Sequence, residues 1–352
     1  MRFQVLSIIG HAPHPLTGEL PSAADRLAQV VDVGVAAEEL GYDAYAVGER
    51  HAGAFLSSSP TVVLGALAAR TTRIRLLTGV TVVAILDPVR VAEDYATLDQ
   101  LSRGRIELVI GKGAEAGHFD LFGLDEARQW DLQQEKYELL RRLWTEEQVD
   151  WAGEFRPALK GVTTVPRPYA GLPRVWHGSA TSLNSPELAA RHGDPLFTAN
   201  AIQPRAAYAR LIDHYRERFA AYGHDPAKAH VAAGSGGLLI ADTHERAVAR
   251  FRDLYEAKVA QSFKPHLAGK AGYNTPFRTI EDAIADGPQL IGSPQQIIDK
   301  ILGYHEVYRH DLQSVTVDAF GQGTAEQIET LQRFAEEIAP VVRKEAPSSL
   351  WS

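Results

Sequence analysis

Residues 41–51, GYDAYAVGERH, show the succession from which the fold is inferred: the end of a helix, a buried strand and polar residues after the strand. Gly41 closes a helical pattern of apolar residues, as glycine commonly does just beyond the end of a helix. The apolar run at residues 43–47 begins almost at once and predicts a buried strand. Polar residues of the sequence ERH then follow that strand. Regular alternation of a helix and a buried strand is typical of parallel α/β proteins.

The same alternation extends in both directions along the chain. Strands are expected at Phe3–Ile9, Asp43–Val47, Arg73–Val83, Ile106–Ile110, Arg174–Gly178, Pro195–Ala199, His230–Ile240 and Gln313–Val317. Helical patterns separate these strands, and the last helices are expected to begin at caps formed by Ser293 and Thr324. Eight such units of about 40 residues fill the 352-residue chain,. We therefore predict an α/β fold, a (β/α)8 or TIM barrel, in one domain at residues 1–352.

Two segments without a clear period interrupt the alternation. Residues 145–173 and 261–292 read as insertions after the fourth and seventh strands, and the second is expected to be irregular. Long loops of this kind are often functional. A doubly wound sheet is the weaker alternative, because the first strand is followed by GHAPH at residues 10–14 rather than by a Gly-x-Gly-x-x-Gly turn,.

Composition excludes several classes of function. The chain has 36 Lys and Arg against 44 Asp and Glu, a net charge of −8, which argues against a nucleic-acid partner,. It has no cysteine, which excludes disulfides, thiolate catalysis and iron–sulfur clusters,. No apolar stretch approaches the roughly 20 residues that span a bilayer. We therefore expect a soluble cytoplasmic protein without a membrane partner.

Residues that follow the strands should carry the chemistry, since TIM-barrel active sites lie at the carboxyl ends of the strands. Residues 178–182, GSATS, lead into a helix, where free N–H groups, hydroxyls and a partial positive charge suit a phosphate. Lys112, in a glycine-flanked turn after the neighbouring strand, could supply a cation. The alternative is a hydroxyl-rich helix start without a ligand.

Glu49, Arg50 and His51 bring an acid, a base and an imidazole together after the second strand. The alternative is a structural ion pair at the rim of the barrel. His11 and His14 flank a proline and lack a third ligand at a suitable spacing, so no metal site is expected.

These residues resemble those of the bacterial luciferase-like flavin-dependent oxidoreductases. In that family the second strand ends in Glu-His-His or Glu-Arg-His, as residues 42–51 do here. The family's most characteristic helix and turn match residues 87–94 and 98–105. The match continues in order through Gly111–Gly113, His118–Phe119, Phe122–Gly123, Trp151, Gly153 and Gly292–Pro294. It therefore covers almost the whole chain.

The resemblance implies a barrel that binds FMN at its C-terminal mouth, where reduced flavin and O2 oxygenate a small organic substrate. It also implies a monooxygenase that forms a homodimer or a higher homo-oligomer, with a separate flavin reductase as a possible partner. Glu49, Arg50 and His51 become the catalytic candidates. Bacterial luciferase has a histidine in place of Arg50, so only His51 is left to take the role of an imidazole.

Cofactor-binding residues are carried over by position. The family often has a non-proline cis peptide beneath the flavin ring, and Gly79–Val80 falls at that place. By the same resemblance, Thr81 and Val83 would line the flavin ring and Lys112 would contact the phosphate. The helix start at residues 178–182 would complete the phosphate site. The candidates are Gly79, Val80, Thr81, Val83, Lys112, Gly113, Glu115, His177, Gly178, Ser179 and Ser182. At Gly178 bacterial luciferase has an acid.

Three other functions remain open at this point. A related barrel could use the deazaflavin coenzyme for hydride transfer without oxygen. A barrel hydrolase could use paired carboxylates such as Glu49 and Glu115. A barrel could also bind flavin without catalysis, because a fold does not by itself guarantee chemistry.

Overall fold

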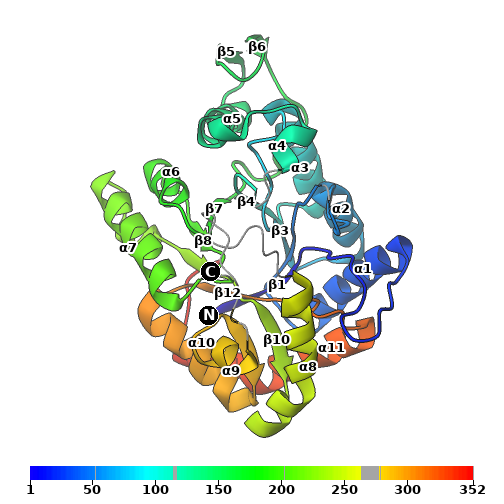
Figure 1. The fold of residues 1–352 in the computed structure, drawn as a ribbon. Helices are drawn as coiled ribbons and strands as arrows, with labels where there is room; N and C mark the ends of the chain where they lie inside the picture. Colours follow the sequence, from blue (N-terminus) through cyan, green and yellow to red (C-terminus); the bar gives the residue numbers. More distant parts are fainter. Residues whose placement is uncertain (52, 114–116, 202, 263–276, 278, 352) are drawn as a thin grey trace.

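The computed structural model describes residues 1–51, 53–113, 117–201, 203–262, 277 and 279–351. Eight parallel strands form a closed barrel, and helices surround it (Figure 1). In order around the barrel these strands are β1 (Arg2–Ser7), β12 (Leu312–Val315), β9 (Val231–Ala233), β8 (Leu196–Thr198), β7 (Val175–Ser179), β4 (Ile106–Ile110), β3 (Arg75–Thr78) and β2 (Ala44–Val47). The predicted (β/α)8 barrel is confirmed.

The surrounding helices largely follow the predicted pattern. They are α1 (Ala23–Glu39), α2 (Pro60–Arg70), α3 (Pro88–Ser102), α4 (Gly117–Leu121), α5 (Gln129–Thr145), α6 (Asn184–His192), α7 (Arg205–Ala221), α8 (His244–Ser262), α9 (Ile280–Ala285), α10 (Pro294–Tyr308), α11 (Thr324–Arg333) and α12 (Ala339–Glu345). Ser293 and Gln296 form the expected capping box of α10,. The predicted cap at Thr324 is wrong: Gly323 occupies the cap position of α11, and no side chain caps that helix.

The predicted strand at residues 230–240 is in fact two strands in different sheets. β9 belongs to the barrel, whereas β10 (Gly237–Ile240) pairs in parallel with β11 (Gln289–Gly292) in a separate two-stranded sheet. The break falls at Gly234, where a Cβ atom would lie 2.0 Å from the carbonyl oxygen of Ala199. The backbone at Gly234 passes so close to the residue that follows β8 that a side chain does not fit, and the strand is interrupted there,.

Both predicted insertions contain regular structure. Residues 145–173 include an antiparallel pair, β5 (Val149–Trp151) and β6 (Leu159–Val162), which projects outward beyond α5 in Figure 1. Residues 261–292 were expected to be irregular, but their described part contains α9 and β11. Residues 263–276 and 278 lie outside the described residues. The predicted third strand also ends early, since β3 stops at Thr78 and only Thr81 makes a further bridge, to Ile110.

A separate apolar cluster fills the interior of the barrel. It includes Leu77, Val109, Trp176 and Leu312 from the strands, and Leu350, whose side chain is completely buried, from near the end of the chain. A buried carboxylate at Glu107 lies beside this cluster. It accepts hydrogen bonds from the indole nitrogens of Trp176 at 2.8 Å and Trp351 at 2.6 Å. The guanidinium groups of Arg75 and Arg174, each 3.2 Å away, balance its charge.

Replacement of Leu350 by alanine should destabilise the protein by about 2–5 kcal/mol, because it leaves a cavity in the barrel interior. Chemical denaturation would measure the change in the free energy of unfolding. Val341→Ala on α12 is the control: Val341 is 42% exposed, and its loss should change stability by less than about 0.5 kcal/mol,. Equal stability of Leu350→Ala and the wild type would show that Leu350 does not support the core.

Candidate active site at the mouth of the barrel

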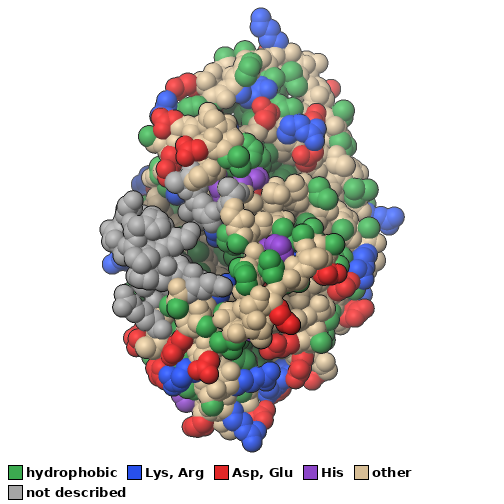
Figure 2. Space-filling model, turned by 45° about the vertical axis from the view of Figure 1, so that its right-hand side comes forward, with side chains coloured by type: hydrophobic (Ala, Val, Ile, Leu, Met, Phe, Trp, Pro, Cys, Tyr) green, Lys and Arg blue, Asp and Glu red, His purple; other side chains and the backbone are tan. Residues whose placement is uncertain are grey.

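The mouth of the barrel is the rim formed by the residues that follow the carboxyl ends of its eight strands. Because the strands are parallel, all of these ends lie on one rim. β4 and β7 are neighbours, and Ile110 pairs with His177. Lys112, two residues beyond the end of β4, and Ser179, the last residue of β7, therefore lie at the same height on adjacent strands. One face of the molecule is hollowed, with hydrophobic and histidine side chains beside the hollow (Figure 2).

Gly79 and Val80 directly follow β3, and Val80 lies over the interior of the barrel. Their peptide bond is cis, as the resemblance implied, and both residues are partly exposed. The side chain of Val80 packs on the interior cluster. A Cβ atom at Gly178 would lie 2.8 Å from Val80 Cγ1, and one at Gly111 would lie 3.0 Å from Val80 Cγ2. Val80 and these two glycines thus form a closely packed, largely apolar floor for the mouth.

A methyl group at Gly178 should disturb this floor. In Gly178→Ala the new Cβ would also lie 3.2 Å from the carbonyl oxygen of Ile110, so Val80 must move. We expect a loss of about 1–3 kcal/mol in the free energy of unfolding, which urea denaturation would measure. Gly65→Ala is the matched control, because nothing lies within 4 Å of its added Cβ and the residue is in α2. A Gly178→Ala variant as stable as the wild type would mean that the floor tolerates the methyl group, whereas Gly65→Ala should be at least as stable as the wild type because alanine favours the helix.

Cationic and backbone groups lie together on the β4–β7 side of the mouth. Lys112 is half-buried, and its Nζ lies 5.8 Å from the ring centroid of Trp130. Burial holds the pKa of its ammonium below the usual value, although the carboxylate of Glu126 raises it. Among the residues that the structure describes, no oxygen accepts a hydrogen bond from Lys112 Nζ. An anion bound here would compensate a charge for which the described residues provide no acceptor.

The turn between β7 and α6 lies beside Lys112. Ser179 Oγ donates to the carbonyl oxygen of Ser182 at 2.8 Å, and Ser182 Oγ accepts from the amide N–H of Asn184 at 3.1 Å. Both hydroxyls therefore shape the turn. Within the described part of the chain, the amide N–H groups of Ala180 and Thr181 have no acceptor. These N–H groups and the start of α6 form a suitable cradle for an anion.

A buried carboxylate and an imidazole form a pair on the β2 side of the mouth. Glu49 Oε1 lies 2.8 Å from His51 Nε2, and Glu49 Oε2 accepts the amide N–H of Val82 at 2.9 Å. Their side chains are 2% and 10% exposed. Both carboxylate oxygens are thus occupied, and the imidazole is held by Nε2. A neutral His51 then keeps its proton on Nε2, so Nδ1 is the nitrogen that can accept a proton.

Arg50 and Gly113 also lie at the mouth. The guanidinium of Arg50 lies 4.8 Å from the ring centroid of Phe55. Gly113 has a φ of +86°, and a Cβ atom there would lie 3.0 Å from Val82 Cγ1, so this position requires glycine,. Glu115 lies outside the described residues.

Three predicted cofactor residues turn their side chains away from the mouth. His177 is completely buried on the outer face of β7, with Nε2 3.1 Å from Asp194 Oδ2 and its ring centroid 4.8 Å from that of Tyr137. Thr81 Oγ1 lies 2.6 Å from the hydroxyl oxygen of Tyr95 on α3. Val83 is completely buried in the core between the barrel and its helices. Their side chains are therefore not placed to contact a ligand in the mouth.

Three polar residues at the mouth were not among the predicted site residues. His118 Nε2 accepts the amide N–H of His51 at 3.3 Å, and their ring centroids are 5.5 Å apart. Arg26 and Asp318 form an ion pair in which each side chain is only 6% exposed. Arg26 could have been found, because it precedes Val30 by four residues on the buried stripe of α1. A charged residue on an apolar stripe needs a buried partner.

A protein-family model described as luciferase-like monooxygenase matches residues 1–311. The chain belongs to the luciferase-like monooxygenase family. The predicted family, and the prediction that the protein is an enzyme of this kind, are therefore confirmed. Among the described residues, no group of three His, Asp or Glu side chains could hold a metal ion, and no helix is long and apolar enough to cross a membrane.

Curated relatives of this luciferase-like chain carry monooxygenase names. Limonene 1,2-monooxygenase of Rhodococcus erythropolis is 25% identical over 308 residues, which cover 86% of this chain and 78% of that protein. FMNH2-dependent dimethylsulfone monooxygenase of Pseudomonas fluorescens (strain Pf0-1) is 29% identical and covers 73% and 70%, respectively.

Solved structures have the same luciferase-like barrel. Monooxygenase RslO1 from Streptomyces bottropensis aligns with a TM-score of 0.84 at 25% identity over 97% of this chain and 99% of that chain. The oxygenating constituent of 3,6-diketocamphane monooxygenase from Pseudomonas putida, solved with FMN, aligns with a TM-score of 0.78 at 20% identity over 97% and 98%. The second likeness supports the fold alone.

Proposed function

We propose that this chain is an FMN-dependent monooxygenase that uses reduced flavin and O2 to oxygenate a small organic substrate. One observation carries the proposal. The anion cradle formed by Lys112 and the turn at residues 179–182 lies on the same rim as the apolar floor at Val80, beside the next strand. FMN needs this combination, because its phosphate is anionic and its ring is flat and largely apolar.

The residues present fit FMN. Lys112 and the N–H groups of Ala180 and Thr181 would hold its phosphate, since all three lack an acceptor within the described residues. Gly79 and Val80 would support its ring. In its reduced form, bound FMN would supply two electrons, so that one atom of O2 could enter the substrate and the other could leave as water. The FMNH2-dependent relative supports this cofactor and a separate reductase that delivers the reduced flavin.

The protein itself would contribute proton transfer at the edge of the ring. Glu49 fixes His51 through Nε2, which leaves Nδ1 to accept or return a proton,. The backbone hydrogen bond to His118 and the ring of Phe122, 4.9 Å from that of His51, restrict the imidazole further. Arg50, next to this pair, would favour negative charge on a flavin or substrate. Homodimer formation and a cytoplasmic location stay predictions.

Lys112→Ala should weaken the binding of FMN by about 10- to 100-fold, as expected for the loss of a charge-assisted hydrogen bond. Fluorescence titration would measure the dissociation constant. Riboflavin, which lacks the phosphate, is the matched control ligand, and its affinity should change little. Lys112→Arg should retain most of the FMN affinity. An FMN affinity unchanged in Lys112→Ala, or an equal loss for riboflavin, would remove the phosphate assignment.

The oxygenation itself can be tested with labelled oxygen. The protein, FMN, NADH and a flavin reductase would be incubated under 18O2 with limonene, dimethyl sulfone and medium-chain alkanals, and mass spectrometry would detect product with one 18O atom. His51→Gln should lower product formation by about 100- to 10,000-fold, because a positioned acid or base contributes that much, while FMN binding is retained. Full activity of His51→Gln would exclude its role in proton transfer.

Two alternatives predict different results in these experiments. Tight binding of the deazaflavin coenzyme in place of FMN would identify a hydride-transfer enzyme of the same fold. FMN binding without oxygen consumption from reduced flavin would identify a flavin-binding barrel without catalysis.

A further inference from the structure

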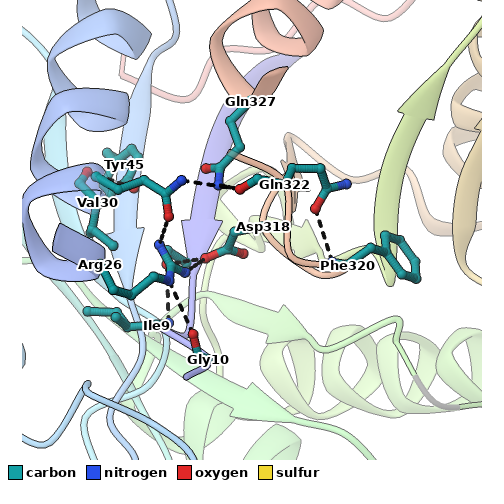
Figure 3. Close-up of polar contacts among 11 residues, drawn as sticks. Ile9, Gly10, Arg26, Val30, Tyr45, Asp318, Phe320, Gln322 and Gln327 are labelled. Carbon is teal, nitrogen blue, oxygen red and sulfur yellow. Dashed lines mark hydrogen bonds and ion pairs between the residues drawn. The ribbon is translucent and has the colours of Figure 1, made fainter. Parts of the chain in front are cut away.

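A second polar group lies at the mouth beside β1 and β12. Asp318 Oδ2 accepts hydrogen bonds from Ser7 Oγ and from Arg26, each at 2.5 Å. Arg26 also donates to the carbonyl oxygen of Gly10 at 3.1 Å (Figure 3). The loop that follows Asp318 is fixed as well, since the amide N–H of Phe320 donates to Gln322 Oε1 at 3.0 Å. Asp318 Oδ2 is therefore held by Ser7 of β1 and Arg26 of α1.

Lys258 on α8, one of the helices around the barrel, is a second cation close enough to feel the charge of Asp318. Phe251, Tyr255 and Lys258 are spaced by four and three residues, so they lie on one face of α8. Tyr255 on that face packs on Phe320, with ring centroids 6.0 Å apart. Because Phe320 is two residues beyond Asp318, the next turn of α8 brings half-buried Lys258 toward Asp318. Burial lowers the pKa of the Lys258 ammonium, and the charge of Asp318 raises it.

Arg26, Asp318 and Lys258 together carry one more positive charge than negative charge. Arg26 already neutralises Asp318 in a nearly buried ion pair. Over the described part of the chain, Lys258 makes no hydrogen bond and no ion pair within 4.0 Å. One half-buried positive charge is therefore left beside the mouth. Partial removal of an ammonium group from water is costly unless an anion or a hydrogen-bond acceptor compensates it.

The position of Lys258 separates it from the proposed phosphate site. Around the barrel, β12 and β4 are four strands apart in a ring of eight, so they lie on opposite sides of the mouth. Lys112 follows β4, whereas Asp318 and Lys258 lie beside β12. One FMN phosphate bound at Lys112 cannot also neutralise Lys258. The charge at Lys258 is left for another molecule.

We propose that Lys258 binds a carboxylate group of the organic substrate on the β12 side of the mouth, near the Arg26–Asp318 ion pair. The inference rests on the proposed function, because it assumes that the flavin occupies the β4–β7 side. It assigns the substrate to organic acids whose reacting carbon lies toward the floor at Val80. Lys258 is then a specificity-determining residue, and it takes no part in the electron transfer.

Equilibrium binding of a matched pair of ligands tests the proposal. Octanoate and its neutral analogue octanamide would be titrated into the FMN-loaded protein at low ionic strength, with calorimetry as the readout. Wild-type protein should bind octanoate at least about tenfold more tightly than octanamide, because only octanoate pairs with the ammonium group. Lys258→Gln should abolish this preference, and Lys258→Arg should restore most of it.

Controls separate the outcomes. Arg250→Gln removes an exposed cation from the same helix, 3.6 Å from Glu326, and should keep the wild-type preference. Circular dichroism would confirm that each variant is folded. Equal binding of octanoate by Lys258→Gln and the wild type would overturn the proposal. Absence of octanoate binding to the wild type, or equal binding of octanamide, would do the same.

The same titrations distinguish this inference from the proposed function. FMN affinity should be unchanged in Lys258→Gln and reduced in Lys112→Ala. Octanoate would also be titrated into protein without FMN. A carboxylate preference that depends on Lys258 in a protein that does not bind FMN would reject the flavin proposal and keep the anion site. FMN binding without any carboxylate preference would reject the anion site alone.

Discussion

Closure of eight parallel strands into one barrel is the constraint on which the site depends. It brings the residues after every strand to a single rim, although Glu49 and Asp318, for example, are about 270 residues apart in sequence,. The rim is useful only because the interior beneath it is solid. Val80 packs against Gly111 and Gly178 on top of a filled barrel, so a ligand lies on the floor and cannot sink into the core.

Charge is distributed unevenly around that floor. Lys112 on one side and Lys258 on the opposite side are half-buried cations without protein acceptors among the described residues. Between them, on the β2 side, Glu49 holds His51 by a single nitrogen. If the proposed roles hold, a molecule in the mouth would meet two positive charges and one group that can exchange a proton. This arrangement favours anionic ligands and gives them a defined direction.

Much of the fold could be predicted from sequence, because buried strands and capped helices leave periodic patterns. The side-chain directions at the site were harder to predict. His177 and Gly178 are adjacent, yet alternation along β7 sends the histidine outward and the glycine inward,. Beyond Thr78 the chain leaves the strand, so Thr81 and Val83 no longer follow its period. Arg26 and Lys258 act across the fold, and local patterns contain no information about such partners.

The end of the barrel at which the strands begin determines how a ligand can enter and leave. Leu350 lies within the interior cluster, and Trp351 is tied to Glu107 beside it. Residues near the end of the described chain thus close the end of the barrel that lies opposite the mouth. A ligand therefore cannot reach the floor at Val80 through the closed end, so it enters and leaves on the side of the mouth.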